Sequence, residues 1–269
     1  MGIAFTQLGS GSRGNSTLIS TEETNILVDQ GLSIKQAEKR LQIIGVDPQT
    51  IDHILVSHEH GDHAGSVIKS AKKWCSKVHA TSPCAHIIGE KKDITIFEPL
   101  ERIELGKKLS ALPIPVPHDS AQNVGFIISD GKGKRGAIAS DLGHVTDEIR
   151  HHLKGCQHIS IEANYDTYLM KKSPYPEHLK SRIEGKLGHL SNEQTANLLS
   201  DVVNPDTSSI ALLHLSETNN RPQAAETSIL LEIEEIYDGV LGVCSQKQSD
   251  FTIFVGEAEL HRPGSGLNS

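Results

Sequence analysis

Histidines crowd one short segment that directly follows an apolar strand. Residues 54–57 have the composition of a buried β-strand, and His58, His60, Asp62 and His63 follow within six residues. Alternate side chains of an extended segment point the same way, so the first two histidines can bind one cation while the aspartate and the last histidine turn toward a second. A single histidine is usually a surface or hydrogen-bonded residue. Three imidazoles crowded beside a carboxylate need partners, and they predict two adjacent metal ions.

Length and composition favour one folded domain. No Pro/Gly/Ser-rich linker divides the 269 residues, and 36% hydrophobic with 22% charged residues is typical of soluble globular proteins. A sizeable core is therefore available. We expect a single domain over residues 1–261, followed by a flexible tail over residues 262–269, which are rich in Gly and Ser.

Several classes of protein are disfavoured by the sequence. No apolar run is long enough to span a bilayer, and residues 1–7 have the pattern of a strand rather than a secretory leader, so we expect a cytoplasmic protein. The four cysteines form no CxxC pair and predict reduced, mostly buried thiols. The net charge of -8 gives no general attraction for nucleic acid, so a polyanionic substrate would need the metal ions and a local basic patch.

Strands and helices alternate along most of the chain. The predicted strands cover residues 3–8, 16–20, 25–29, 78–80, 94–97, 109–116, 124–129, 136–140, 158–164, 209–216, 239–244 and 251–255. The predicted helices cover residues 33–44, 64–75, 146–153, 191–203 and 222–237. We expect an α/β (α+β) fold of the αββα sandwich type, in which residues 239–244 and 251–255 complete the second sheet and the strand-end loops converge at one edge.

Other potential ligands also lie where strands are predicted to end. His118 and Asp141 each come just past a predicted strand, and His214 lies at the end of another. His189 stands directly ahead of a helix that opens with a capping box. Asp29 closes an early strand, where a carboxylate is better placed to orient a ligand imidazole than to bind a metal itself. These segments add to the 58–63 segment as sources of metal-ligand chemistry.

The first predicted turn, residues 9–16, is dense in glycine and serine. It has two interpretations: a plain hairpin loop, or a backbone surface that approaches the metal site or a substrate phosphate. In the second case Ser12, Arg13 and Asn15 would be the hydrogen-bond donors.

A basic segment follows the middle of the chain. Five basic residues stand against two acidic ones between residues 171 and 186, a local +3, and two tyrosines lie in or beside the segment. It is either a solvated helix with an irregular lead-in or a platform that tracks phosphates and stacks bases. The candidate substrate-binding residues of the second interpretation are Lys171, Lys172, Lys180 and Arg182.

The His-x-His-x-Asp-His pattern at residues 58–63 resembles the signature of the metallo-β-lactamase superfamily. Four further blocks narrow the resemblance to the YycJ (WalJ) family: the Gly-Ser-Gly-Ser-x-Gly-Asn-Ser turn and residues 140–144, 188–193 and 214–220. These blocks reach from residue 9 to residue 220. The main departure is Ala163, where serine would be expected.

The resemblance implies an assignment of the metal ligands. One metal would be held by His58, His60 and His118, the other by Asp62, His63 and His214, with Asp141 bridging the two. This set of imidazoles and carboxylates suits Zn²⁺, Mn²⁺ or Fe²⁺.

The resemblance also implies a two-metal phosphodiesterase, a DNA exonuclease linked with mismatch repair. In this hypothesis the metals share a hydroxide that Asp62 orients, and His189, braced by Glu162, protonates the leaving oxygen. His189 has alternative roles as a neighbour of the helix cap or as a further metal ligand.

Two other functions fit the same residues. The net charge of -8 favours a small cyclic phosphodiester or a thioester as the substrate, because a long polyanion would be repelled. A non-catalytic DNA-repair partner would be expected to lack one or more ligands, and this sequence retains them all. The sequence does not predict an oligomeric state.

Overall fold

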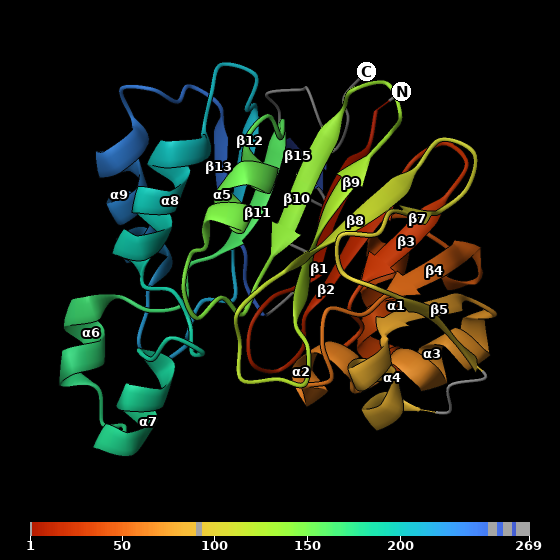
Figure 1. Ribbon diagram of the computed structural model, residues 1–269, viewed down its shortest axis with the longest axis horizontal. Coiled ribbons are helices and arrows are strands. Elements are labelled where there is room, and N and C mark those ends of the chain that lie inside the picture. The colour runs from red at the N-terminus through yellow and green to blue at the C-terminus, as the bar shows by residue number, and fades with distance from the viewer. Residues whose placement is uncertain (1, 90–92, 247–251, 255–259, 262–269) are drawn as a thin grey trace.

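Two β-sheets pack face to face in the computed structural model, which describes residues 2–89, 93–246, 252–254 and 260–261 (Figure 1). The first sheet contains, in spatial order, β15 (Leu260–His261), β14 (Thr252–Phe254), β1 (Ala4–Gly9), β2 (Ser16–Ser20), β3 (Asn25–Val28), β4 (Ile51–Leu55), β5 (Lys77–Thr81) and β6 (Ile94–Phe97). The second contains β13 (Val240–Val243), β12 (Ser209–Leu213), β11 (His158–Glu162), β10 (Arg135–Ala139), β9 (Val124–Ser129), β8 (Ser110–Pro115) and β7 (Ile103–Glu104).

Helices cover the outer face of each sheet (Figure 1). The first sheet is covered by α1 (Ile34–Ile43), α3 (Val67–Trp74) and α4 (Ser82–Ile88), and the second by α5 (Asp147–Leu153), α8 (Asn192–Val202) and α9 (Pro222–Ile233). A third apolar cluster, which includes Phe5, Leu55 and Phe126, fills the space between the sheets. The predicted αββα sandwich is confirmed.

Short helices complete the chain. They are α2 (Gly61–Ala64), α6 (Thr167–Lys172), α7 (Glu177–Ile183) and a 3₁₀ turn at Pro48–Thr50. Both α6 and α7 lie below the second sheet in Figure 1, near the edge where the strand-end loops gather. The basic segment therefore forms two short helices instead of one.

Two local predictions were wrong. Residues 64–75 do not form one helix, because α2 begins at Gly61 and the chain bends before α3, where the Ser66 amide donates to the Gln30 carbonyl. Asp62 and His63 thus lie in a helical turn and not in an extended loop. Residues 252–254 belong to the first sheet, because β14 pairs antiparallel with the edge that β1 leaves open.

Other predictions have mixed outcomes. Cys84, Cys156 and Cys244 are buried and Cys75 is exposed, all as free thiols, so the expectation of mostly buried cysteines is confirmed. No helix in the described part of the chain is long and apolar enough to cross a bilayer. The tail at residues 262–269 lies outside the described residues, and the domain boundary at residue 261 and the cytoplasmic location stay predictions.

Three strand ends share an unusual backbone conformation. Asp29, Asp141 and His214 follow β3, β10 and β12, and their φ angles are 61°, 54° and 54°. Residues other than glycine rarely adopt this left-handed region, and such strain gathers where function requires it. The turn at each strand end directs the side chain toward the edge of the sandwich that the next subsection describes.

Backbone hydrogen bonds help to pack the segment that follows β4 against two other loops. The Asn15 amide donates to the Asp62 carbonyl at 2.7 Å, and the Gly31 amide donates to the Asn15 carbonyl at 3.0 Å. A Cβ atom on Gly31 would lie 1.7 Å from the Asp62 carbonyl oxygen, whereas one on Gly61 would meet nothing within 4 Å. Glycine at position 31 therefore permits this close approach.

Gly31→Ala should destabilise the fold by about 3 kcal/mol or more, since backbone must move to admit the methyl group. Urea denaturation of the metal-free protein measures this loss. Gly61→Ala, at the start of the neighbouring α2, is the matched control and should change stability by no more than about 0.5 kcal/mol. Equal stabilities for the two variants would contradict the packing described here.

A histidine is buried between the sheets away from the loop edge. His158 contacts the Ser209 hydroxyl at 3.0 Å through Nδ1 and the Ser160 hydroxyl at 2.7 Å through Nε2, and its ring packs against Phe5. Burial lowers the pKa of His158 to about 3. The folded protein thus keeps this imidazole neutral where the unfolded chain, with a histidine pKa near ~6.5, takes up a proton.

The contribution of His158 to the free energy of unfolding should therefore be fully present above about pH 6.5. It should fall by about 1.4 kcal/mol per pH unit as the pH drops toward 3. Between pH 6.5 and 5, wild type should lose about 2 kcal/mol more than His158→Asn in urea denaturation. His86→Asn, which alters an exposed histidine, should keep the wild-type slope. Parallel pH profiles for wild type and His158→Asn would show that His158 does not titrate in this way.

Candidate metal centre

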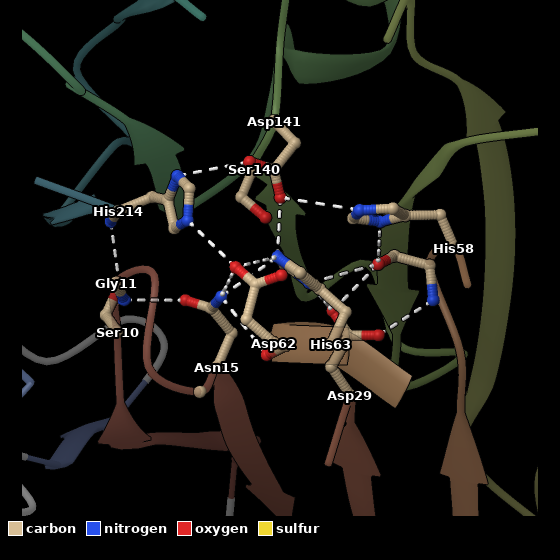
Figure 2. Close-up of polar contacts among 12 residues, drawn as sticks. Ser10, Gly11, Asn15, Asp29, His58, Asp62, His63, Ser140, Asp141 and His214 are labelled. Atoms are coloured by element: carbon tan, nitrogen blue, oxygen red, sulfur yellow. Dashed lines mark hydrogen bonds and ion pairs between the residues drawn. The ribbon is translucent and has the colours of Figure 1, made fainter. Parts of the chain in front are cut away.

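Histidines and carboxylates from distant parts of the chain meet at one edge of the sandwich (Figure 2). Within each of four groups, one potential ligand atom per residue lies within 4.8 Å of the others. The groups are His58, His60 and His118; Asp62, His63 and His214; His58, His63 and Asp141; and Asp141, Glu162, His189 and His214. The two ligand sets expected from the sequence are therefore each brought together.

Asp141 lies between these sets. Figure 2 shows its carboxylate between His214 on one side and His58 on the other. The Oδ2 atom is 2.5 Å from His63 Nε2 and 3.9 Å from His58 Nε2, and Oδ1 is 3.1 Å from His214 Nδ1. With 2% of its surface exposed, this carboxylate is in a position to be shared by cations on both sides.

Hydrogen bonds to Nδ1 orient several of the imidazoles. His63 Nδ1 contacts Asp29 Oδ2 at 2.7 Å, His58 Nδ1 contacts the Ser57 hydroxyl at 3.0 Å, and His118 Nδ1 donates to the Gly188 carbonyl at 3.1 Å. Such contacts fix the ring and leave Nε2 for a metal. Asp29 thus orients a potential ligand, as its place at the end of β3 suggested.

A buried glutamate supports two further histidines. Glu162, at the end of β11, places Oε1 2.7 Å from His189 Nδ1 and 3.0 Å from His214 Nδ1. Its other oxygen accepts the Leu142 amide at 2.8 Å, one residue past Asp141. Glu162 thereby couples the positions of three strand-end loops.

One buried nitrogen shows that the cluster fits a cation. His58 Nε2 is buried and has no hydrogen-bond partner among the described residues. A buried polar atom without a partner is costly, and a metal ion would satisfy it. The neighbouring imidazoles and carboxylates are donors that zinc and related divalent ions accept.

The charges within the cluster are strongly coupled. Burial, reinforced by the neighbouring His63, lowers the pKa of His58 well below its ordinary value despite the opposing charge of Asp141. Burial also opposes charge on His214, but Asp141, Asp62 and Glu162 outweigh it and raise its pKa to about 10. Protons therefore balance the buried carboxylates here, and a bound cation would displace them.

A cavity of about 330 Å³ opens over the cluster. Its floor includes His60, Asp62, Asp141 and His214. Ser12, His118, Asp119, Gly188 and His189 contribute other parts of the lining, and Tyr175, Leu179, Arg182 and Ile183 face it from the α6–α7 segment (residues 167–183).

The three candidate residues of the glycine-rich turn differ in their position relative to the cavity. Ser12 lines the cavity, but Arg13 pairs with Glu217. Asn15 is buried, with its amide nitrogen 2.9 Å from His63 Nε2 and its oxygen accepting the Gly11 amide. Asn15 therefore faces the metal cluster and supports the turn, where the sequence suggested a donor to substrate.

The four candidate basic residues also differ in their position relative to the cavity. Arg182 lines the cavity and pairs with Asp119. Lys171, Lys172 and Lys180 are not among the cavity-lining residues, and Lys180 pairs with Glu177.

Sequence reasoning missed several residues of the site. Leu179 and Ile183 lie one turn apart in α7, and this spacing could have marked them. Tyr175, one of the two tyrosines noted with the basic segment, also lines the cavity. Glu59 was hidden between two histidines, and its Oε1 accepts the Ala121 amide at 2.7 Å, linking two ligand loops. Nothing in the sequence distinguished this glutamate from a surface residue.

Comparison with known proteins identifies the family. Residues 24–214 match the model of the Beta-lactamase superfamily domain. Exodeoxyribonuclease YycJ of Bacillus anthracis is 31% identical over 245 residues, covering 89% of this chain and 92% of that protein. Exodeoxyribonuclease WalJ of Streptococcus pneumoniae is 30% identical over 249 residues, with 89% and 91% covered.

A solved structure agrees with this fold. Zn²⁺-bound PqqB from Methylobacterium extorquens superposes with a TM-score of 0.68, at 16% identity over 93% of this chain and 99% of that one. This likeness supports the fold, and the sequence relatives confirm the resemblance drawn from the motifs. The chain belongs to the β-lactamase superfamily, in the family of YycJ and WalJ, and is a metal-dependent hydrolase.

Proposed function

We propose that the protein is a dinuclear metal-dependent phosphodiesterase that acts on DNA as an exonuclease in DNA repair. The observation that carries this proposal is the meeting of two histidine-containing ligand sets at the single carboxylate of Asp141. The relatives named exodeoxyribonucleases support a DNA substrate, because the chain matches about nine-tenths of their length.

Seven residues would hold the two ions. They are His58, His60 and His118 for one, Asp62, His63 and His214 for the other, and Asp141 between them. Bound divalent ions, zinc or manganese with iron(II) as a third candidate, would lower the pKa of a water molecule and stabilise charge on the phosphate.

Asp62 and His189 act directly on the reacting groups in this proposal. Asp62 lines the cavity and lies 3.5 Å from His214 Nε2, where its carboxylate can orient the attacking water. His189 also lines the cavity, and Glu162 holds its Nδ1, so Nε2 is the nitrogen that would give a proton to the leaving oxygen.

Substrate contacts are divided between the cavity and its surroundings. Ser12 and Arg182 would contact the phosphate within the cavity. Lys171, Lys172 and Lys180 would attract the part of the DNA that extends beyond it. Arg13 would contribute once substrate phosphate competes with Glu217 for its guanidinium group.

A small cyclic phosphodiester is the second candidate substrate. The cavity volume of about 330 Å³ and the net charge of -8 both favour a compact ligand. The two candidates differ in whether a polymer is cleaved.

Metal-reconstituted protein should bind about two ions per chain and degrade linear DNA. The assay offers duplex DNA, single-stranded DNA, RNA and a chromogenic phosphodiester side by side, with metal content read by elemental analysis. Asp62→Asn should lower DNA turnover at least about 100-fold, since it weakens a ligand and the orientation of water. Asp147→Asn, on the exposed start of α5, is the control and should keep both metal content and turnover.

Hydrolysis of the chromogenic substrate without any cleavage of DNA or RNA would favour the small-molecule alternative. One ion per wild-type chain at saturating metal would refute the dinuclear centre.

The loss of activity on replacing the proposed general acid, His189, should depend on the leaving group. His189→Gln should lower kcat on DNA about 10²-fold to 10⁴-fold while metal content stays unchanged. The loss should be much smaller for a p-nitrophenyl phosphodiester, because its leaving oxygen needs little protonation. His144→Gln is a control, since this nearby histidine contacts the Lys186 carbonyl and is not among the cavity-lining residues. Full DNA turnover in His189→Gln would contradict the acid role.

A further inference from the structure

The α6–α7 segment is tied to the body of the protein on both sides of the cavity. The Tyr175 hydroxyl donates to the Thr218 hydroxyl at 3.2 Å, in the loop that follows β12. Arg182 Nε donates to Asp119 Oδ2 at 2.7 Å, next to His118. Both Tyr175 and Arg182 line the cavity, so each tie lies at its boundary.

The first tie continues into the glycine-rich turn. Thr218 follows Glu217, which pairs with Arg13, and Ser12 beside Arg13 lines the cavity. Three loops are thus joined in a row, from the turn through residues 217 and 218 to Tyr175. A polymer that passed through on this side would have to break these contacts.

The second tie is reinforced by two hydrogen bonds to backbone carbonyls. The Asp119 amide donates to the Leu187 carbonyl at 3.1 Å, and His118 Nδ1 donates to the Gly188 carbonyl. The chain that leaves α7 is therefore attached to the same loop that Arg182 contacts. This side of the cavity is also closed to a continuous strand.

The volume of the cavity agrees with closure at both sides. About 330 Å³ is near the lower limit for pockets that hold a small ligand, which is ~300 Å³. One nucleotide is a ligand of that class, whereas a strand that enters and leaves needs an open groove. The lining offers a tyrosine for a base or sugar and an arginine for a phosphate.

We propose that the Tyr175–Thr218 and Arg182–Asp119 contacts make the metal cavity a blind pocket, which admits only the terminal nucleotide of a DNA strand. The inference rests on the proposed phosphodiesterase function and names the residues that limit it to strand ends. Water adds across the P–O bond that joins the terminal nucleotide to the next one. The phosphorus gains the hydroxyl oxygen, the leaving oxygen gains a proton, and one mononucleotide is released.

The experiment compares linear and circular single-stranded DNA of the same sequence, with metal-loaded enzyme and product lengths resolved on a gel. Wild type should release mononucleotides from the linear strand and cleave the circle at least 100-fold more slowly. Thr218→Val and Tyr175→Phe each remove one hydroxyl of the first tie. Both variants should release products of two or more nucleotides and cleave the circle at least 10-fold faster than wild type.

Tyr168→Phe is the matched control, because it removes a hydroxyl from α6 at a tyrosine that is not among the cavity-lining residues. Its products should have the wild-type length. Thermal unfolding of all variants checks that the fold is retained, and Thr218→Val keeps the test open should Tyr175→Phe unfold.

The outcomes separate this inference from the function on which it rests. Equal cleavage of circle and linear strand by wild type, or mononucleotides alone from both folded variants, overturns the blind pocket and leaves the phosphodiesterase intact. Failure of wild type to cleave any DNA overturns the proposed function, and the blind pocket with it.

Discussion

A carboxylate buried among imidazoles is the interaction on which the rest of this structure depends. Asp141 is almost fully buried and contacts His63 and His214 directly. Taking such groups from water is costly unless every polar atom finds a partner. Asp29 and Glu162 provide those partners on either side, and His58 Nε2 still has none among the described residues. A divalent cation would supply the missing partner.

The fold brings strand ends together at one edge of the sandwich, where these buried groups contact one another. The exits of β3, β10 and β12 turn through left-handed backbone at Asp29, Asp141 and His214. Such conformations cost of order 1–3 kcal/mol each and persist only when the surroundings impose them. Here two packed sheets and the close contact between Gly31 and Asp62 impose them. The packing of the two sheets thus fixes the positions of the potential ligands.

Much of the fold and of the candidate site could be predicted from the sequence, because local sequence patterns indicate these features. Alternating apolar residues indicated the strands, and the capping box at Ser191 indicated a helix start. The ligand groupings came from a motif and a family resemblance, and the structure brings those residues together. Failures arose where distant contacts decide: β14 joined the first sheet because β1 had an open edge, and the chain bent at Ser66 because Gln30 accepts its amide. The pairing of Arg13 with Glu217, more than 200 residues away, is another contact that no local pattern reveals, and the role of Arg13 toward a substrate stays a prediction.

The ligands are also widely separated along the chain. His58 follows β4 in the first sheet, whereas His214 follows β12 in the second, so neither half of the sandwich contains a whole set. During synthesis, which proceeds from the N-terminus, the early half can fold long before the last ligand has been made. A chain that stops before residue 214 would lack the group formed by Asp62, His63 and His214. Assembly of the full cluster therefore depends on nearly the whole length of the polypeptide.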